Sequence, residues 1–323
     1  MSLFTKSFVV DLGTSTTQVY QRGAGVVLDE PSLVAVDKPG GKIVAVGNAA
    51  KSMTEKNPDN VIIIKPMSFG AVADYDLTRN MIKSFLRKCP SGLAKPRVTI
   101  IASGGITEVE KKAVKEAFMS AGAKSASFVN KGLVSALMAG VLDENAGGSM
   151  VIDIGGGTTE LALLSFGGVI SSKSIKVGGD SFDSSIKEYI RKNHGIVIGV
   201  KSAENVKCSL ANTVDGEITA CGRDIKTGLP KTIFLCPEQI KDAMRSCFTQ
   251  ISDAADSMLE EAPVDLVADI KGKGIVVTGG GGKLCGICSF LSDRLNIPVR
   301  YSMNDDPGQC CDEIIRYAGG RAI

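Results

Sequence analysis

Two segments of this chain repeat one pattern, and that repetition constrains the fold more than any other feature. The segment FVVDLGTSTT begins at Phe8 and VIDIGGGTTE begins at Val151; each is an apolar run that ends in an aspartate, a glycine turn and hydroxyl side chains. Apolar, β-branched runs of this kind are typical of buried strands, and glycine permits the tight turn that follows. A chain of 323 residues is long enough for two sizeable cores. The repeat therefore predicts a fold made of two similar halves.

The residues around both motifs predict mixed α/β layers. Each motif is followed by further β-rich runs and then by segments with helical spacing, such as residues 76–88 in the first half and 237–262 in the second. Another expected helix opens with a capping box from Thr107 to Glu110 and ends at Gly122. A hairpin is expected at residues 37–41. No low-complexity linker separates the halves, so we expect them to pack against each other.

The composition is that of an ordinary globular protein. Hydrophobic residues make up 44% and charged residues 22% of the chain, and 37 Lys and Arg against 35 Asp and Glu give a net charge of +2. This balance argues against a large nucleic-acid-binding surface. No stretch approaches the roughly 18 uninterrupted apolar residues of a membrane span, and the N-terminus lacks the features of a signal peptide. We therefore expect a soluble cytoplasmic protein with no nucleic-acid partner.

The nine cysteines are expected to be reduced thiols, because the chain carries no secretion signal. Only Cys285 with Cys288 and the adjacent pair of Cys310 and Cys311 resemble metal-ligand spacing. A lone CxxC is a weak signal, and the sequence leaves open whether these four thiols bind a metal.

The repeated motif has a chemical logic that suits phosphate groups. Glycines let backbone N–H groups approach an anion closely, and the threonine and serine hydroxyls add donors. The aspartates, Asp11 and Asp153, are hard oxygen ligands suited to Mg²⁺, held through its waters. A third glycine turn, TGGGGKL, begins at Thr278 after another apolar strand. Since neither GxxxxGK[ST] nor GxGxxG is present, we expect a nucleoside triphosphate to be held between two facing turns.

In this order the motifs resemble the first and second phosphate loops of the superfamily of actin, sugar kinases and DnaK-type chaperones. The closer resemblance is to the MreB-type bacterial actins and covers nearly the whole chain, through segments such as VVLDEPSLVAVD, ADYDLTRNMIKSF, MVIDIGGGTTELALLSFGGVISSKSIKVGGDSFD and GIVVTGGGGKL. It implies an α/β, actin-like ATPase fold, with duplicated ribonuclease-H-like halves and a nucleotide cleft between them. It also implies a filament-forming scaffold for cell shape that binds ATP and Mg²⁺. Its partners would be further copies of itself, the inner membrane surface and cell-shape membrane proteins.

The resemblance divides the chain into four subdomains. Subdomain IA comprises residues 1–31, 66–146 and 306–323, and subdomain IB comprises residues 32–65. Subdomain IIA comprises residues 147–178 and 237–305, and subdomain IIB comprises residues 179–236.

The same resemblance assigns functional residues. Nucleotide contacts are assigned to Asp11, Gly13, Thr14, Ser15 and Thr16 in the first loop, Gly155, Gly156, Gly157 and Thr158 in the second, Gly178, Gly179 and Asp180 after it, Glu204 and Lys207 one helical turn apart, and Gly279, Gly280, Gly281 and Gly282 in the third turn. Asp153, Thr158 and position 131 are the catalytic positions, and Asp11 and Asp153 are the Mg²⁺ positions. Membrane contact is assigned to Leu3, Phe4 and Leu93, which would place the protein peripherally at the inner membrane.

Two positions depart from the family pattern. Thr16 stands where the first loop usually has asparagine. Lys131 stands where the family has the glutamate that positions the attacking water, with Asn130 and Gly132 in place of its usual neighbours. The sequence therefore supports nucleotide binding better than hydrolysis, and at best a slow ATPase is expected.

Two alternatives stay open. A small-molecule phosphotransferase of the same superfamily would need a substrate pocket and a carboxylate base near the terminal phosphate, and no added segment is available to build one. A scaffold that binds nucleotide without hydrolysing it would fit Lys131 as well.

Overall fold

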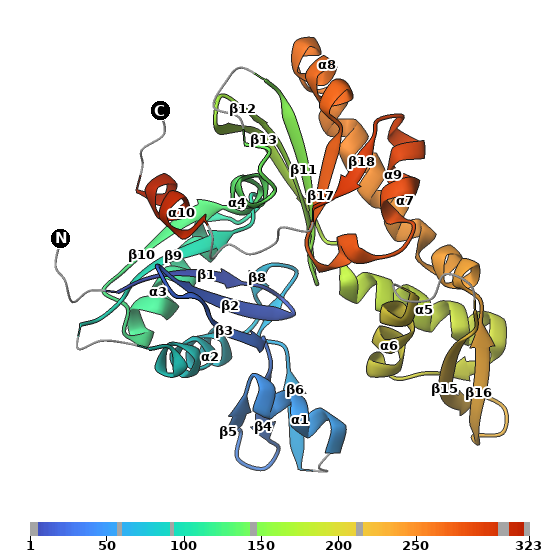
Figure 1. Ribbon diagram of the computed structural model, residues 1–323. Helices are drawn as coiled ribbons and strands as arrows, with labels where there is room; N and C mark the ends of the chain where they lie inside the picture. Colours follow the sequence, from blue (N-terminus) through green and yellow to red (C-terminus); the bar gives the residue numbers. More distant parts are fainter. Residues whose placement is uncertain are drawn as a thin grey trace.

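The chain builds two five-stranded sheets with the same connectivity, which lie side by side (Figure 1). The computed structural model describes residues 6–56, 60–90, 94–142, 147–210, 216–302 and 310–319. The first sheet has the order β10-β9-β1-β2-β3 and the second the order β13-β12-β11-β17-β18. The strands of the first are β1 (Ser7–Leu12), β2 (Thr16–Gln21), β3 (Gly25–Pro31), β9 (Arg97–Ala102) and β10 (Ser125–Asn130). Those of the second are β11 (Ser149–Ile154), β12 (Thr159–Ser165), β13 (Gly168–Ile175), β17 (Ile275–Thr278) and β18 (Val299–Tyr301).

The two sheets correspond strand by strand. In the first, β1, β2 and β3 form an antiparallel meander, and β9 and β10 add parallel to β1. In the second, β11, β12 and β13 form the meander, and β17 and β18 add in parallel. Asp11 pairs with Gln18 in the first meander, and Asp153 pairs with Glu160 in the second. The predicted duplication is confirmed, and it gives both aspartates the same place in their sheets.

Each half carries a smaller sheet that projects from it (Figure 1). In the first half, the order β5-β4-β6 is formed by β4 (Val34–Asp37), β5 (Ile43–Val46) and β6 (Val61–Ile64), with α1 (Asn48–Lys56) beside it. A short pair, β7 (Met67–Ser68) and β8 (Ala71–Val72), leads back to the main sheet. In the second half, the order β14-β15-β16 is formed by β14 (Ile196–Val197), β15 (Ile218–Asp224) and β16 (Pro230–Leu235).

Helices cover the sheets and join the halves. The first half contains α2 (Tyr75–Lys88), α3 (Glu108–Ala121) and α4 (Lys131–Met138). The second contains α5 (Gly179–His194), α6 (Val200–Leu210), α7 (Pro237–Glu260), α8 (Val264–Lys273), the 3₁₀ helix η1 (Gly280–Lys283) and α9 (Ile287–Leu295). The helix α10 (Cys311–Ala318) returns to pack on β1, β9 and β10. The expected hairpin at 37–41 and the capping box at Thr107 are present, whereas α8 was not predicted.

Helix α4 lies between the sheets and contacts strands of both. It starts directly after β10, and the side chain of Asn130 caps it by accepting a hydrogen bond from the N–H of Leu133 at 3.2 Å. Its buried residues belong to a hydrophobic cluster drawn from both halves, which includes Val9 and Leu133 as well as Val151 from the second sheet. The halves therefore share a core in addition to the two cores of their own.

The predicted subdomain boundaries are compatible with this arrangement and stay a prediction. Each of the four larger sheets falls inside one of the proposed segments.

We predict that Gly132→Ala destabilises the protein. A Cβ at this position would lie 2.4 Å from the Cβ of Ala162 on β12, and a Cβ fixed to the backbone of a central strand cannot move away. Overpacking of this kind lowers the free energy of unfolding by about 1–3 kcal/mol. Thermal melting should show the loss. The matched control is Gly272→Ala in α8, where a Cβ would meet no atom within 4 Å and should leave the melting temperature unchanged or slightly higher.

Candidate nucleotide-binding site

The two repeated motifs form turns of the same geometry. The N–H of Gly13 donates to the carbonyl of Thr16 at 3.1 Å, and the N–H of Gly155 donates to the carbonyl of Thr158 at 2.8 Å. Each turn follows a strand whose penultimate residue is the aspartate, Asp11 in β1 or Asp153 in β11.

The two turns approach each other closely, and glycine is what permits it. A Cβ on Gly156 would lie 2.1 Å from the hydroxyl oxygen of Ser15, and one on Gly157 would lie 2.6 Å from that of Thr14. Thr14 is buried, and its hydroxyl accepts a hydrogen bond from the N–H of Gly70 at 2.9 Å. The structure thus brings the first and second predicted phosphate loops together, one from each half.

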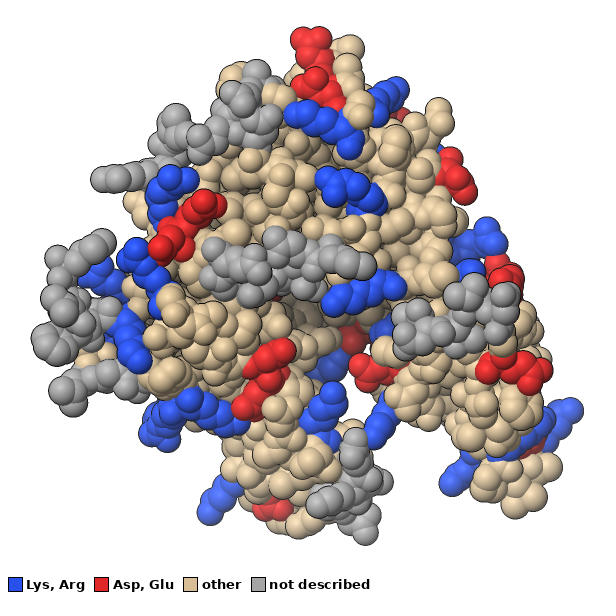
Figure 2. Space-filling view, in the orientation of Figure 1, with Lys and Arg blue, Asp and Glu red and all other residues tan. Residues whose placement is uncertain are grey.

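The start of α5 supports the second loop. The N–H groups of Gly179 and Asp180 donate to the carbonyls of Gly155 and Gly156 at 3.0 and 2.7 Å. The carboxylate of Asp180 pairs with the ammonium of Lys65, which comes from the other half, at 2.8 Å. The predicted residues at 178–180 therefore lie beside the second loop. Asp180 also joins the two halves through this ion pair. Figure 2 shows a notch in the molecular surface between the two lower lobes, which carry the small sheets of the two halves.

The third glycine turn packs against the end of β11. Gly279 has a φ of +79°, a backbone conformation that favours glycine, and a Cβ there would lie 2.6 Å from the carbonyl oxygen of Ile154. A Cβ on Gly281 would lie 2.3 Å from the side chain of the same residue. Residues 280–283 then form η1. This turn therefore lies next to the second loop. The turn follows β17 and the second loop follows β11, and these two strands are parallel neighbours in the sheet.

The two predicted residues of α6 differ in their surroundings. The ammonium of Lys207 lies 2.8 Å from the carboxylate of Asp183 and donates to the carbonyl of Gly179 at 3.1 Å. Burial raises the pKa of the Asp183 carboxyl, although the bond to Lys207 acts in the opposite direction. Glu204 is exposed. The structure thus brings Lys207 to the start of α5, where it holds α6 beside the second loop.

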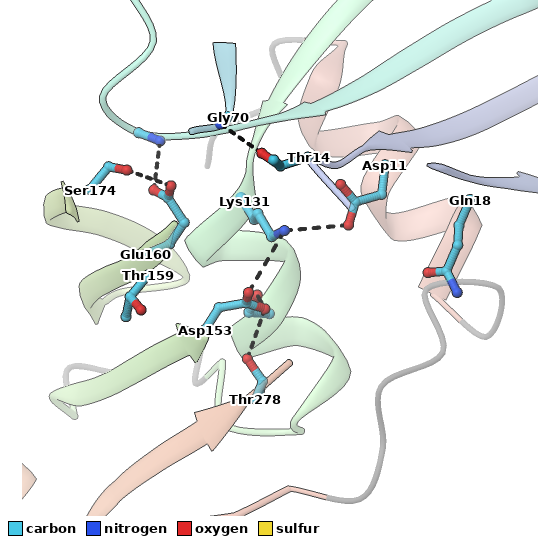
Figure 3. A network of polar contacts seen from close by, with 12 residues as sticks. Asp11, Thr14, Gln18, Gly70, Lys131, Asp153, Thr159, Glu160, Ser174 and Thr278 are labelled. Atoms are coloured by element: carbon cyan, nitrogen blue, oxygen red, sulfur yellow. Dashed lines mark hydrogen bonds and ion pairs between the residues drawn. The ribbon is translucent and has the colours of Figure 1, made fainter. Parts of the chain in front are cut away.

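Lys131 occupies the centre of the site (Figure 3). Its ammonium lies 3.5 Å from an oxygen of Asp11 and 3.7 Å from an oxygen of Asp153, so that it pairs with the equivalent carboxylates of both halves. Burial acts to lower the pKa of Lys131. The charges of Asp11, Asp153 and Glu160, with the bond to Asp11, outweigh that effect and hold the pKa above its ordinary value. The side chain is therefore a cation in this site.

The geometry agrees with the sequence comparison. The model of the MreB/Mbl protein family matches residues 5–314. The chain belongs to the MreB/Mbl family.

Relatives of this MreB/Mbl family member cover nearly its whole length. The cell shape-determining protein Mbl of Bacillus cereus is 39% identical over 308 residues, which span 94% of this chain and 92% of that protein. The crystal structure of MreB5 of Spiroplasma citri bound to AMPPNP superposes with a TM-score of 0.88 at 33% identity, over 97% of this chain and 95% of that one. A chain of the MamK double helical filament, at 19% identity and a TM-score of 0.80 over 97% of this chain and 99% of that one, shares the fold. The actin-like fold expected from the sequence is confirmed.

Several polar residues of this family member's site were not predicted. One oxygen of the buried Asp153 accepts hydrogen bonds from the hydroxyls of Ser135 and Thr278 at 2.9 and 3.0 Å. The buried Glu160 accepts from the hydroxyl of Ser174 at 2.7 Å and from the N–H of Gly104 at 3.2 Å (Figure 3). Glu160 is the last residue of the second motif, and its pairing with Asp153 across two strands is the signal that could have identified it.

The predicted Mg²⁺ position lies between the two aspartates that Lys131 contacts. Asp11 and Asp153 are the expected oxygen donors, but a single ammonium is already paired with both of them. A second cation between these carboxylates would meet the charge of Lys131 at short range. Among the described residues no three His, Cys, Asp or Glu side chains gather as a metal site, and this includes Cys285, Cys288, Cys310 and Cys311. The arrangement of Asp11, Lys131 and Asp153 therefore does not fit a divalent ion held between the aspartates.

The predicted membrane contacts, Leu3, Phe4 and Leu93, lie outside the described residues. None of the described helices combines the length and the hydropathy needed to cross a bilayer.

Proposed function

We propose that this MreB/Mbl protein binds ATP between its two halves and assembles with further copies of itself into filaments that act as a scaffold for cell shape. The main observation behind the proposal is that the two phosphate loops lie close together. Each loop is a turn of the same geometry in one of the two duplicated sheets. MreB5, which shares 33% of its residues with this chain, has been crystallised with AMPPNP and with ADP.

In this proposal the three glycine turns hold different parts of the nucleotide. The N–H groups of Gly13 and Gly155 bond within their own turns, and the backbone N–H groups and hydroxyls of residues 14–16 and 156–158 are donors of the kind that bind phosphate oxygens. The turn at 279–282, packed beside the second loop, and Lys207 with Glu204 on α6 would contact the nucleoside. Gly178, Gly179 and Asp180 support the second loop at the start of α5.

Exposed apolar side chains support the proposal of self-association. In the second half, Val197 on β14, Phe234 on β16, and Ile225 and Leu229 in the turn between β15 and β16 are all more than half exposed. Exposed apolar side chains of this size are available for contacts with another protein.

ATP should stabilise the folded protein and drive its assembly. Saturating ATP with Mg²⁺ present is expected to raise the melting temperature, since a ligand at 100 times its dissociation constant adds about 2.7 kcal/mol. It should also increase the fraction that pellets in the ultracentrifuge, with filaments visible by electron microscopy. Gly156→Val, whose side chain would meet Ser15, should abolish both effects, whereas Gly272→Ala should retain them. An unmoved melting temperature in the wild type would refute the binding site; a shift without pelleting would refute the filament alone.

We further propose that any hydrolysis of ATP is slow. One residue normally orients the attacking water in phosphoryl transfer, and an ammonium has no acceptor for such a water. The neighbouring acceptors are engaged: the side-chain oxygen of Asn130 caps α4, and both oxygens of Glu160 accept hydrogen bonds. The lack of an available acceptor for the attacking water favours a scaffold that stays bound to ATP. No observation favours the alternative of a phosphotransferase.

Restoring a carboxylate at position 131 should accelerate hydrolysis. A positioned base contributes about 10²–10⁴ in rate, so Lys131→Glu is expected to release phosphate much faster than the wild type. The control is Lys173→Glu, which makes the same change of charge at a lysine bonded to Ser257 outside the loops. The rates of steady-state phosphate release by the wild type and the two variants should be compared at protein concentrations above and below the polymerisation threshold. Equal rates for the wild type and Lys131→Glu would remove Lys131 from the mechanism.

We also propose that the protein lies peripherally at the inner membrane, where cell-shape membrane proteins would be its partners, through Leu3, Phe4 and Leu93. Burying one large apolar side chain contributes only about 1.5–3 kcal/mol, so stable attachment would need a filament that presents many copies. Replacing Leu3 and Phe4 by serine should therefore reduce co-sedimentation with liposomes most strongly under polymerising conditions. Undiminished co-sedimentation would exclude the N-terminal contact.

A further inference from the structure

We propose that the Lys131 ammonium is the built-in counter-ion of this cleft and takes the place between Asp11 and Asp153 that a divalent cation would need, so that a nucleoside triphosphate binds here without Mg²⁺. The inference rests on the proposed nucleotide site and specifies its ion requirement. It concerns the binding step and is independent of how fast ATP is hydrolysed.

The first support is the position of the ammonium. It lies between the two aspartates at 3.5 and 3.7 Å, and each aspartate is the penultimate residue of the central strand of one half. The lysine side chain is only 20% exposed. It is the first residue of α4, whose cap and buried face fix the position of its backbone.

The second support is that Asp153 has little freedom to turn toward another ion. Its side chain is 7% exposed, and one of its oxygens already accepts hydrogen bonds from Ser135 and Thr278. The remaining oxygen faces Lys131. To hold a metal ion at this place, the site would have to separate the ammonium from both carboxylates, which leaves a largely buried ammonium without these partners.

The third support is the balance of charge. Two carboxylates, those of Asp11 and Asp153, lie 3.5 and 3.7 Å from the Lys131 ammonium. The family resemblance predicts glutamate at position 131. Lysine in its place raises the charge of the site by two units, which is the charge of one Mg²⁺ ion. The chain thus carries covalently the positive charge that would otherwise have to be recruited with the nucleotide.

Lysine is a suitable group for this role. A lysine ammonium is a compact charge with three donors, and lysine serves as a phosphate-binding residue in other nucleotide sites. Lys131 lies in the same close cluster as the first and second loops, since Asp11 and Asp153 stand two residues before the glycines of their turns. Phosphates held by these loops would be near a cation that two aspartates keep in place.

The test compares the binding of AMPPNP, which is not hydrolysed, with Mg²⁺ and with excess EDTA, by isothermal titration calorimetry. For the wild type the dissociation constants in the two conditions are expected to agree within about threefold. For Lys131→Met, which keeps most of the length of the unbranched side chain without its charge, removal of Mg²⁺ should weaken binding by at least about tenfold. Lys131→Glu should depend on Mg²⁺ at least as strongly. Lys173→Met, at a lysine outside the loops, should behave as the wild type.

The outcomes distinguish the counter-ion role of Lys131 from the nucleotide-binding site itself. A wild-type protein that needs Mg²⁺ for tight binding overturns the counter-ion role and leaves the nucleotide site standing. A Lys131→Met protein that ignores Mg²⁺ also overturns it. No binding of AMPPNP by the wild type in either condition refutes the proposed function itself. The wild-type comparison requires no variant to fold, and Lys131→Glu gives a second reading if Lys131→Met is unstable.

Discussion

The central interaction of this structure is the contact of one lysine with two equivalent aspartates. Asp11 and Asp153 are the penultimate residues of the corresponding strands of two similar sheets, and Lys131 reaches both from the helix that lies between them. Two carboxylates brought so close repel each other unless a cation lies between them. The lysine supplies that cation from within the chain and so links the two halves at this point.

Glycine allows the rest of the cleft to form around this contact. The loops of the two halves approach so closely that a side chain at Gly156 or Gly157 would overlap Ser15 or Thr14. The same residues leave backbone N–H groups available to an anion. The duplicated turn therefore serves both the packing of the halves and the proposed binding of phosphate groups, which explains why the motif occurs once in each half.

A nucleotide site of this design would favour a long-lived bound state. An ammonium in place of a water-orienting carboxylate removes an acceptor, while it adds positive charge beside the phosphate loops. A filament built from such subunits would remain in its triphosphate form for longer than one whose subunits hydrolyse rapidly. In the MreB/Mbl family, to which this chain belongs, that property suits a stable scaffold better than a rapidly exchanging one.

The sequence by itself determined the duplication, the three glycine turns, the capping box at Thr107 and the unusual residue at position 131, because these depend on local periodicity and on residue type. It did not reveal α8, because the helical spacing of this short segment is weaker than the patterns of its neighbours, the long helix α7 and the apolar strand β17. Nor did it reveal that Glu160, Ser135 and Thr278 surround the central charges, since these residues meet only through strand register and helix packing. Only the tertiary structure decided that Lys131 points between the two aspartates, because Asp11 is 120 positions away in the chain and Asp153 belongs to the other half, and helix α4 contacts strands of both halves.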